Sequence, residues 1–237
     1  MILHNATRYK AVFFDAGDTL LTIPGARETM RRYLADNAFH RTEEEIGERF
    51  DAAFRLLYYN KPVLGNELCS PESDRAFWVN LYGHMLNELG AREQIEEELI
   101  HRWCHEMYDL FVSPEQYVLF DDVRDTLEAL QARGYRMAIV SNFAPTLRGI
   151  LRYMEIEPYF DPIIVSTEVG LEKPNPAIFR LALEQSGLSA NEVLYIGDHD
   201  KNDIWAPGQV GIDAVKIKRY AYHTGEGIHS LRELWQD

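Results

Sequence analysis

The sequence predicts an α/β fold, a doubly wound parallel sheet with a helical domain inserted near its start, from three observations. The run Ala11-Val-Phe-Phe14 is apolar without polar alternation, which is typical of a strand buried on both faces. After Tyr117, short β-rich runs alternate with helical segments, as in βαβ units. Between Pro24 and about Phe111 there is almost no strand signal. The simplest organisation is a Rossmann-like core of residues 1–21 and 116–237 with a helical bundle of residues 22–115.

Four helices are expected in the inserted domain. The first covers about residues 25–39, and the second follows Thr42, whose spacing to Glu45 fits a capping box. A loop at 60–70 separates the second from a third helix at 71–90, and a fourth covers about 92–111. Five aromatic residues recur at helical spacing and are expected in the bundle core rather than in a ligand site. They are Phe77, Trp78, Tyr82, Trp103 and Tyr108.

The core segments follow in alternation. Helices are expected at 122–133, after Pro145, at 176–187 and from about Ile204. Strands are expected at 135–140, 163–166, 193–197 and 214–217.

Composition limits the partners and the compartment. Hydrophobic residues make up 46% of the 237 residues, and the net charge is −14. Nucleic acid and an anionic membrane surface are therefore not expected as partners, because both need a basic patch. No apolar run reaches the about 18 residues of a membrane span, and His4, Asn5 and Arg8 interrupt any signal-peptide core, so a cytoplasmic location is expected. Cys69 and Cys104 have no metal-ligand spacing and are read as free thiols.

Polar residues follow the predicted strands at their carboxyl ends, where open parallel sheets bind ligands. They are Asp15 and Asp18 after the first strand, Ser141 and Asn142 after the second, Lys173 in the loop after the third, and Asp198 and Asp203 after the fourth. Taken alone, residues 15–20 fit a turn as well as an active site, since Gly17 tolerates positive φ and Asp18 suits an Asx-type loop. Crowded carboxylates raise one another's pKa or bind a divalent cation, and an oxygen-only ligand set favours Mg²⁺.

Together, these motifs resemble the haloacid dehalogenase-like hydrolases, in the branch whose helical cap is inserted after the first motif. The family pattern is an Asp-x-Asp-Gly-Thr loop, a Ser or Thr after the second strand, a Lys, and Gly-Asp followed by a further Asp. The matching residues, in order and spacing, are Asp15, Thr19, Ser141, Lys173, Gly197, Asp198 and Asp203.

The resemblance implies a Mg²⁺-dependent phosphatase that acts on a small phosphorylated metabolite, a phosphate monoester. Asp15 would be the nucleophile that forms an aspartyl-phosphate, and Lys173 would stabilise it together with the phosphoryl oxygens. Ser141, with Asn142 beside it, would donate a hydrogen bond to the phosphoryl group. The metal ligands would be Asp15, the Gly17 carbonyl, Asp198 and Asp203. The inserted helices would form a mobile cap that excludes water and selects the substrate.

One departure concerns the general acid/base. Phosphatases of the family carry an Asp two residues after the nucleophile, where this chain has Gly17, and the carboxylate of Asp18 comes one residue later. Asp18 either reaches the leaving group from there or only braces the loop.

Three alternatives stay open. A 2-haloacid dehalogenase also lacks that acid, but such relatives need no metal and do not keep the Gly-Asp motif. A phosphonatase-like hydrolase would use a cap lysine as a Schiff base, for which Lys61 is the only lysine in the predicted cap. A non-catalytic member would use the fold as a binding module, with Asp18 in a structural role.

Overall fold

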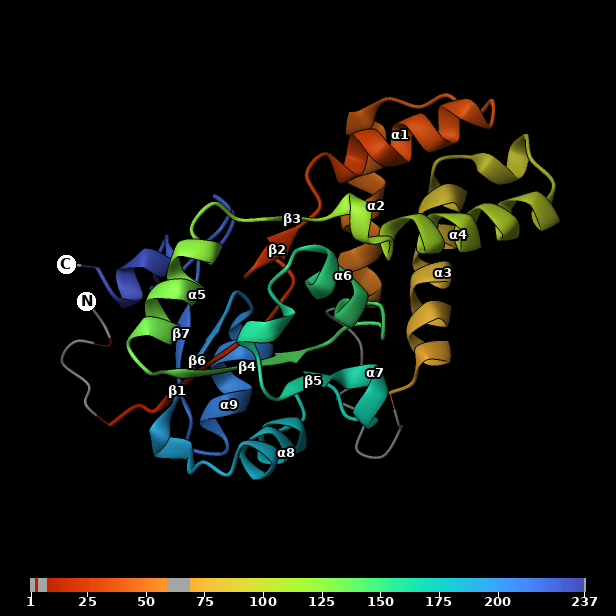
Figure 1. The fold of residues 1–237 in the computed structure, drawn as a ribbon. Helices are drawn as coiled ribbons and strands as arrows, with labels where there is room; N and C mark the ends of the chain where they lie inside the picture. The colour runs from red at the N-terminus through yellow and green to blue at the C-terminus, as the bar shows by residue number, and fades with distance from the viewer. Residues whose placement is uncertain (1–2, 4–7, 59–68, 237) are drawn as a thin grey trace.

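The computed structural model describes residue 3 and residues 8–58 and 69–236. Its core is a five-stranded, fully parallel sheet in the order β5-β4-β1-β6-β7 (Figure 1), which confirms the predicted doubly wound α/β fold. The strands are β1 Ala11–Phe14, β4 Arg136–Ser141, β5 Ile163–Val165, β6 Val193–Gly197 and β7 Asp213–Lys216. Phe14 pairs with Ile139 of β4 and with Ile196 of β6, so the three central strands end at the same edge.

Helices cover both faces of this sheet. Alternate residues of β1 point to opposite faces, and both sets are apolar and buried. Val12 and Phe14 lie in one buried cluster with apolar residues of α5 and α6, whereas Ala11 and Phe13 lie in another with those of α8. The core helices are α5 Val123–Ala132, α6 Leu147–Tyr153, α7 Ser166–Val169, α8 Ala177–Ser186 and α9 Ala206–Gly208. Short 3-10 turns add Pro114–Gln116, Glu157–Tyr159, Ala190–Glu192 and Leu231–Leu234.

The helix expected from about Ile204 is present but short, and it begins earlier, with a π-helical turn. A π-helical turn, Asp200–Trp205, precedes α9, which has only three residues. The turn begins where Nδ1 of His199 accepts hydrogen bonds from the backbone amides of Lys201 and Asn202. A side chain that satisfies these amides starts the turn earlier than the apolar periodicity indicated.

The inserted helices are α1 Ala26–Asp36, α2 Glu43–Leu57, α3 Pro71–Glu88 and α4 Glu97–Phe111. They pack around a buried cluster of their own, and the capping box between Thr42 and Glu45 is present. The predicted start of the fourth helix at residue 92 was wrong. Residues Ala91–Glu93 form a 3-10 turn, and Glu96 is extended at ψ 143°, so α4 begins only at Glu97. Most of the expected loop at 60–70, including Lys61, lies outside the described residues.

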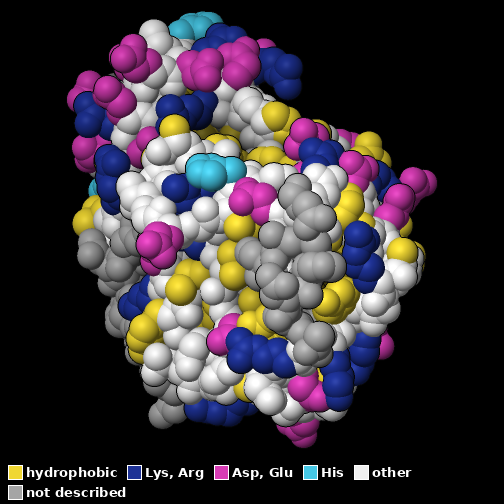
Figure 2. Space-filling view, turned by 90° about the vertical axis from the view of Figure 1, so that its left-hand side faces the viewer, with side chains coloured by type: hydrophobic (Ala, Val, Ile, Leu, Met, Phe, Trp, Pro, Cys, Tyr) yellow, Lys and Arg dark blue, Asp and Glu magenta, His cyan; other side chains and the backbone are white. Residues whose placement is uncertain are grey.

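A short antiparallel ladder joins the core to the bundle. β2 (Leu21–Thr22) pairs with β3 (Val118–Leu119), so the two chain segments that enter and leave the bundle run side by side (Figure 1). On the face of the molecule drawn in Figure 2, acidic and basic side chains are both spread over the surface, with hydrophobic ones between them. Within the described residues, the helices are all too short or too polar to cross a membrane.

Candidate active site

The candidate site lies at the carboxyl edge of the three central strands. Asp15 directly follows β1, Ser141 is the last residue of β4, and Asp198 directly follows β6. The backbone amide of Asp15 donates to the carbonyl of Ile196 at 2.9 Å, which continues the β1–β6 pairing by one residue. This places a carboxylate at the end of an apolar strand, with only 7% of the residue exposed.

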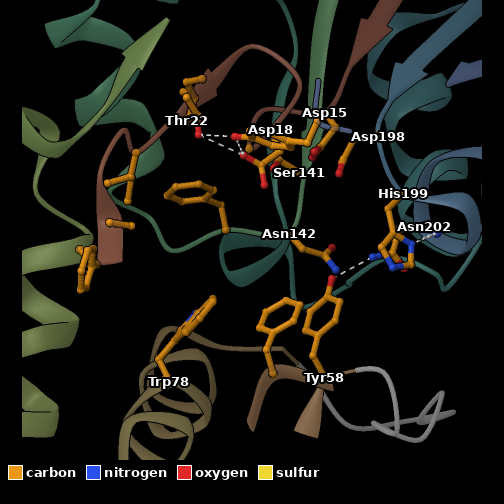
Figure 3. A pocket seen from close by; sticks show the side chains of 18 of the residues that line it. Asp15, Asp18, Thr22, Tyr58, Trp78, Ser141, Asn142, Asp198, His199 and Asn202 are labelled. Atoms are coloured by element: carbon orange, nitrogen blue, oxygen red, sulfur yellow. Dashed lines mark hydrogen bonds between the residues drawn. The ribbon is translucent and has the colours of Figure 1, made fainter. Parts of the chain in front are cut away.

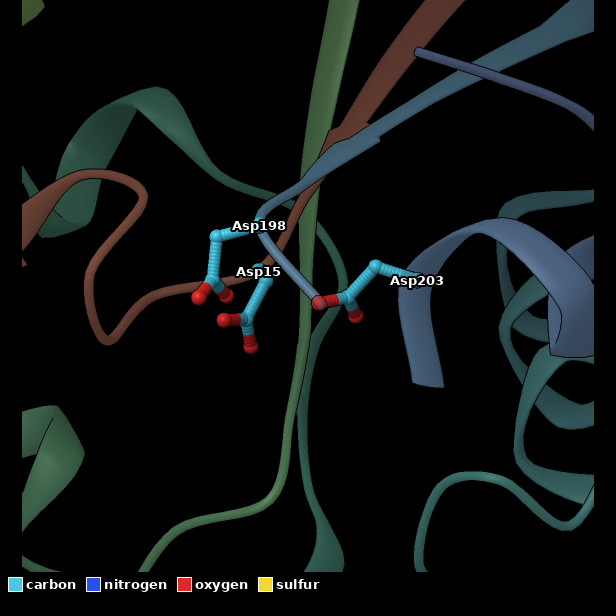
Figure 4. A group of neighbouring side chains, drawn as sticks. All are labelled: Asp15, Asp198 and Asp203. Carbon is cyan, nitrogen blue, oxygen red and sulfur yellow. The ribbon is translucent and has the colours of Figure 1, made fainter. Parts of the chain in front are cut away.

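Three carboxylates face one another at this edge. Asp15, Asp198 and Asp203 each present one oxygen, and these oxygens lie within 4.8 Å of one another (Figure 4). Asp203 is 1% exposed and comes from the π-helical turn, not from a strand end. The chain therefore folds back on itself after Asp198 to bring the third carboxylate in.

Lys173 places its ammonium group between two of these acids. Its Nζ donates to Oδ1 of Asp15 and to Oδ1 of Asp203, both at 2.7 Å. A third bond, of 3.0 Å, reaches the hydroxyl of Tyr195 in β6. Burial lowers the pKa of Lys173, but the two carboxylates outweigh it, so the pKa lies well above its ordinary value and the side chain stays charged.

The carboxylates outnumber the positively charged side chains that contact them. Burial raises the pKa of Asp15 to about 6, against the opposing charge of Lys173. Burial likewise raises the pKa of Asp198 to about 9, and the carboxylates of Asp203 and Asp15 add to the effect. One lysine does not neutralise two buried carboxylates and the partly buried Asp198, and such a group takes up protons or a divalent cation.

Gly197 permits the close approach of Asp203. A Cβ atom on Gly197 would lie 2.4 Å from Cγ of Asp203, a distance that no side chain tolerates. The other oxygen of Asp203, Oδ2, accepts a hydrogen bond from the amide of His199 at 3.0 Å. The Gly197-Asp198 pair at the end of β6 thus places two carboxylates at the site. One is that of Asp198 itself, and the other is that of Asp203, which packs against Gly197.

Asn142 fixes the backbone of the lysine rather than facing the acids. Its side-chain amide donates to the carbonyl of Lys173 at 2.8 Å, and its Oδ1 accepts from the amide of Lys173 at 2.7 Å. Ser141 is 1% exposed, and its hydroxyl makes a hydrogen bond that lowers the pKa of Asp15. Ser141 therefore lies beside the Asp15 carboxylate, and Asn142 positions the loop that carries Lys173.

Asp18 lies next to this group in a loop of unusual conformation. Its φ is +51°, in the left-handed region, where Asp is better tolerated than most residues. Oδ1 of Asp18 accepts a hydrogen bond of 2.7 Å from the hydroxyl of Tyr220. It accepts another, of 3.2 Å, from the hydroxyl of Thr22 (Figure 3). The carboxylate lines the same cavity as Asp15.

A cavity of about 990 Å³ opens from these acids toward the inserted helices. Its bundle side is lined by aromatic residues, among them Phe54, Trp78 and Tyr82. Trp78, Tyr82 and Tyr108 were expected in the bundle core only. They do belong to the bundle's apolar cluster, but the same helix faces continue onto the cavity.

The inserted helices contact the core at Tyr58, the last described residue before residues 59–68. Its hydroxyl accepts a hydrogen bond of 2.9 Å from Nδ2 of Asn202, and its ring lies edge-on to His199 with centroids 6.2 Å apart. Burial lowers the pKa of His199, and its ring caps the π-helical turn.

Sequence reasoning missed Tyr195, Tyr58 and Tyr220. Tyr195 was read as part of an apolar strand, although a hydroxyl in a strand buried on both faces must find a partner. It donates to the carbonyl of Val140 at 2.8 Å and accepts from Lys173. Tyr58 and Tyr220 come from a helix end and a loop, where no periodicity marks a side chain for the site.

The donor set fits a magnesium ion. The three carboxylates supply oxygen atoms only, and within the described part of the chain no histidine or cysteine joins their group, which matches a hard cation. The carbonyl of Gly17, a residue that also lines the cavity, is the fourth expected ligand.

Comparison with known sequences gives consistent matches. Residues 9–211 match the haloacid dehalogenase-like hydrolase family. The haloacid dehalogenase-like hydrolase domain-containing protein 3 of Danio rerio is 30% identical over 215 residues, which cover 88% of this chain and 84% of that protein. The phosphoglycolate phosphatase of Escherichia coli K12 is 34% identical over 143 residues, which cover 60% of this chain and 55% of that enzyme.

Solved structures share the fold. The HAD-hydrolase YfnB of Bacillus subtilis, solved with magnesium bound, has a TM-score of 0.73 at 21% identity, covering 97% of this chain and 98% of that one. A 2-haloacid dehalogenase of Pseudomonas syringae has a TM-score of 0.61 at 23% identity, covering 95% and 96%. At such identities the likeness extends to the fold alone.

Proposed function

Because this chain belongs to the haloacid dehalogenase-like hydrolases, we propose that its site hydrolyses a small-molecule phosphate monoester through an aspartyl-phosphate, with Mg²⁺ as cofactor. One observation carries the proposal: a buried lysine bonds Asp15 and Asp203 while Asp198 lies within 4.8 Å of both. A phosphoryl group needs this combination of a nucleophile, a fixed cation and a set of oxygen ligands. The similarity to a phosphoglycolate phosphatase supports the same reaction class.

Each residue has a defined part in the reaction. The Asp15 carboxylate forms a bond to phosphorus while the ester P–O bond breaks, and the leaving alkoxide takes a proton from Asp18. Water then attacks the phosphorus of the aspartyl-phosphate and gives a proton to Asp18, which releases inorganic phosphate and restores Asp15. Lys173 stabilises the charge on Asp15 and on the phosphoryl oxygens, and Ser141 donates to one of those oxygens.

The metal would be held by the carboxylates of Asp15, Asp198 and Asp203 and by the Gly17 carbonyl. When bound, Mg²⁺ supplies positive charge that offsets the repulsion between the nucleophile and an anionic phosphoryl group. Asp198 and Asp203 also weigh against the dehalogenase alternative, because a halide-displacing aspartate has no anionic phosphoryl group to neutralise. The phosphonatase alternative depends on Lys61, which lies outside the described residues.

The test compares Asp15→Asn with the wild type on p-nitrophenyl phosphate, with and without Mg²⁺. We expect the wild type to be active only with Mg²⁺ and the variant to be inactive, because an amide is not a nucleophile. Asp213→Asn, which changes an exposed acid far from the site, is the control. Full activity in Asp15→Asn would overturn the proposal, as would chloride release from 2-chloropropionate without Mg²⁺ in place of phosphatase activity.

A further inference from the structure

The bundle side of the cavity is a connected set of aromatic rings, which we call the aromatic wall. It consists of Phe50, Phe54, Tyr58, Trp78, Tyr82 and Phe111. Phe54 is stacked on Tyr58 with ring centroids 4.6 Å apart, and it contacts Phe50 and Trp78 at 6.2 Å. Tyr82 continues the series to Trp78 and Phe111, also at 6.2 Å. The rings thus form one continuous surface and not isolated core residues.

This wall lies opposite the acids. In Figure 3, Trp78 and Tyr58 project from the inserted helices across the cavity from Asp15 and Asp18. A phosphate held at Lys173 would therefore direct the rest of its ester toward the rings. Trp78 is only partly buried, so part of its ring is free to contact a ligand.

The charges near the wall do not favour a second anion. Arg27 is the cation that the described inserted helices place on the cavity lining, and its guanidinium is paired with Asp51 at 2.8 Å. Glu43 and Asp74 also line this side, so the described helices contribute three carboxylates and one guanidinium. A carboxylate or second phosphate in the leaving group would meet net negative charge.

We infer that the substrate is a phosphate monoester whose leaving group carries a planar, uncharged ring system, which stacks on the aromatic wall. The inference rests on the proposed phosphatase function and names its substrate class. A cavity of about 990 Å³ accommodates a ring of one or two cycles beside the phosphate, far more than a two-carbon leaving group fills. Two chemical sources fit, an arylalkyl alcohol and a nucleoside, because both present a flat neutral π face.

The experiment separates ring recognition from leaving-group reactivity. Four primary-alcohol esters are compared with the wild type and Mg²⁺: 2-(1-naphthyl)ethyl phosphate, a nucleoside 5′-monophosphate, ethyl phosphate and phosphoglycolate. Naphthylethyl and ethyl phosphate have leaving groups of similar acidity, so the ring is their main difference. We expect kcat/KM for at least one ring ester to exceed that for ethyl phosphate by about 10-fold or more, and phosphoglycolate to be the poorest substrate. The two ring esters distinguish the arylalkyl source from the nucleoside source.

Variants of the wall then test the location of the ring. Trp78→Leu keeps an apolar side chain but removes the ring, and it should lower kcat/KM for the preferred ester about 10-fold more than for ethyl phosphate. Trp78→Phe should retain most of the preference. Tyr153→Leu, which removes an exposed ring on α6, is the matched control. Equal turnover of ring esters and ethyl phosphate by the wild type, or an equal loss on all esters in Trp78→Leu, would overturn the inference.

Binding of the free ring alcohols separates this inference from the proposed function. Calorimetry with 2-(1-naphthyl)ethanol and with the nucleoside needs no catalysis. Binding that Trp78→Leu weakens, without turnover of any phosphate ester, would support the aromatic wall and contradict the phosphatase. Turnover of ethyl phosphate without ring preference or ring binding would support the phosphatase and contradict the wall.

Discussion

The hydroxyl of Tyr220 donates a 2.7 Å hydrogen bond to Oδ1 of Asp18, so a residue 202 positions away holds the carboxylate that follows the nucleophile. The same oxygen accepts from Thr22 at 3.2 Å, so both of these hydrogen bonds are made by Oδ1. A carboxylate held by one oxygen keeps the other for proton transfer. The structure therefore allows Asp18 to act as acid/base and to brace its loop at the same time.

Substitution of Asp18 by Asn separates these two roles. The amide oxygen of Asn still accepts from Tyr220 and Thr22, but the side chain no longer transfers a proton. We expect kcat to fall about 10² to 10⁴-fold while the Mg²⁺ concentration for half-maximal activity stays the same. Steady-state kinetics with an alkyl phosphate, whose leaving group needs protonation, is the measurement. Activity within about twofold of the wild type would mean that Asp18 only braces the loop.

An Asp at position 17 should restore the activity lost in Asp18→Asn. A Cβ on Gly17 meets no atom within 4 Å, and Gly17 does not have a positive φ, so the backbone accepts a side chain there. Gly17→Asp in the Asp18→Asn background places a carboxylate two residues after Asp15, as in related phosphatases, and we expect a recovery of kcat of about tenfold or more. The double variant Gly17→Asn with Asp18→Asn is the control. Equal activity of the two double variants would show that a carboxylate at position 17 does not act as an acid/base in this chain.

The close contact between Gly197 and Asp203 predicts a metal-binding defect. In Gly197→Ala the new methyl group would occupy the place of the Asp203 side chain, so Asp203 must move away from Asp15 and Asp198. We expect the Mg²⁺ concentration for half-maximal activity to rise about 10 to 100-fold, as for other changes that misplace metal ligands. Gly149→Ala is the matched control, because a Cβ on Gly149 meets no atom within 4 Å. Unchanged Mg²⁺ dependence in Gly197→Ala would show that Asp203 does not contribute to metal binding.

The sheet was predictable because its signals are local. A strand without polar alternation, such as β1, is buried on both faces, and the parallel order then sets which strand ends meet. The positions of Asp15, Ser141 and Asp198 at one edge follow from that topology. The chemical roles of these three residues do not follow from the topology, and those roles remain predictions.

The features that the sequence did not predict depend on contacts between segments that are distant in the chain. The β2–β3 ladder has two residues in each strand, too few for a pattern. The π-helical turn starts from a histidine ring, whereas periodicity counts only apolar side chains. Trp78 shows a further limit, because its helix face both packs in the bundle and lines the cavity. The spacing of apolar residues along the helix is the same whether they pack in a core or line a cavity. Contacts such as Tyr220 with Asp18 join loops that no sequence period connects.

The buried pair of Asp122 and Arg219 predicts a loss of stability on substitution. Arg219 donates to both carboxylate oxygens, at 2.8 and 2.9 Å, and also to the carbonyl of Thr19. Asp122 accepts two more bonds, from the hydroxyl of Ser230 and the amide of Leu231. The pair thus joins the loop that follows Asp15, the start of α5 and the chain near residue 230. In Asp122→Asn the guanidinium loses its charged partner, which should lower the free energy of unfolding by about 3–5 kcal/mol.

The pH dependence of that loss tests its electrostatic origin. Burial acts to raise the pKa of Asp122, but the hydrogen bonds and charge of Arg219 outweigh it and leave the pKa below its ordinary value. The stabilisation is therefore complete above the unfolded-state pKa, about 3.9, and disappears as pH falls through the lower folded-state pKa. In denaturant unfolding at a series of pH values from about 7 to about 3, the difference between wild type and Asp122→Asn should shrink toward the acid end. Asp121→Asn, next in the chain but exposed, should change stability little at any pH. A difference between wild type and Asp122→Asn that stays constant down to the acid end would mean that the substitution acts through packing and not through the ion pair.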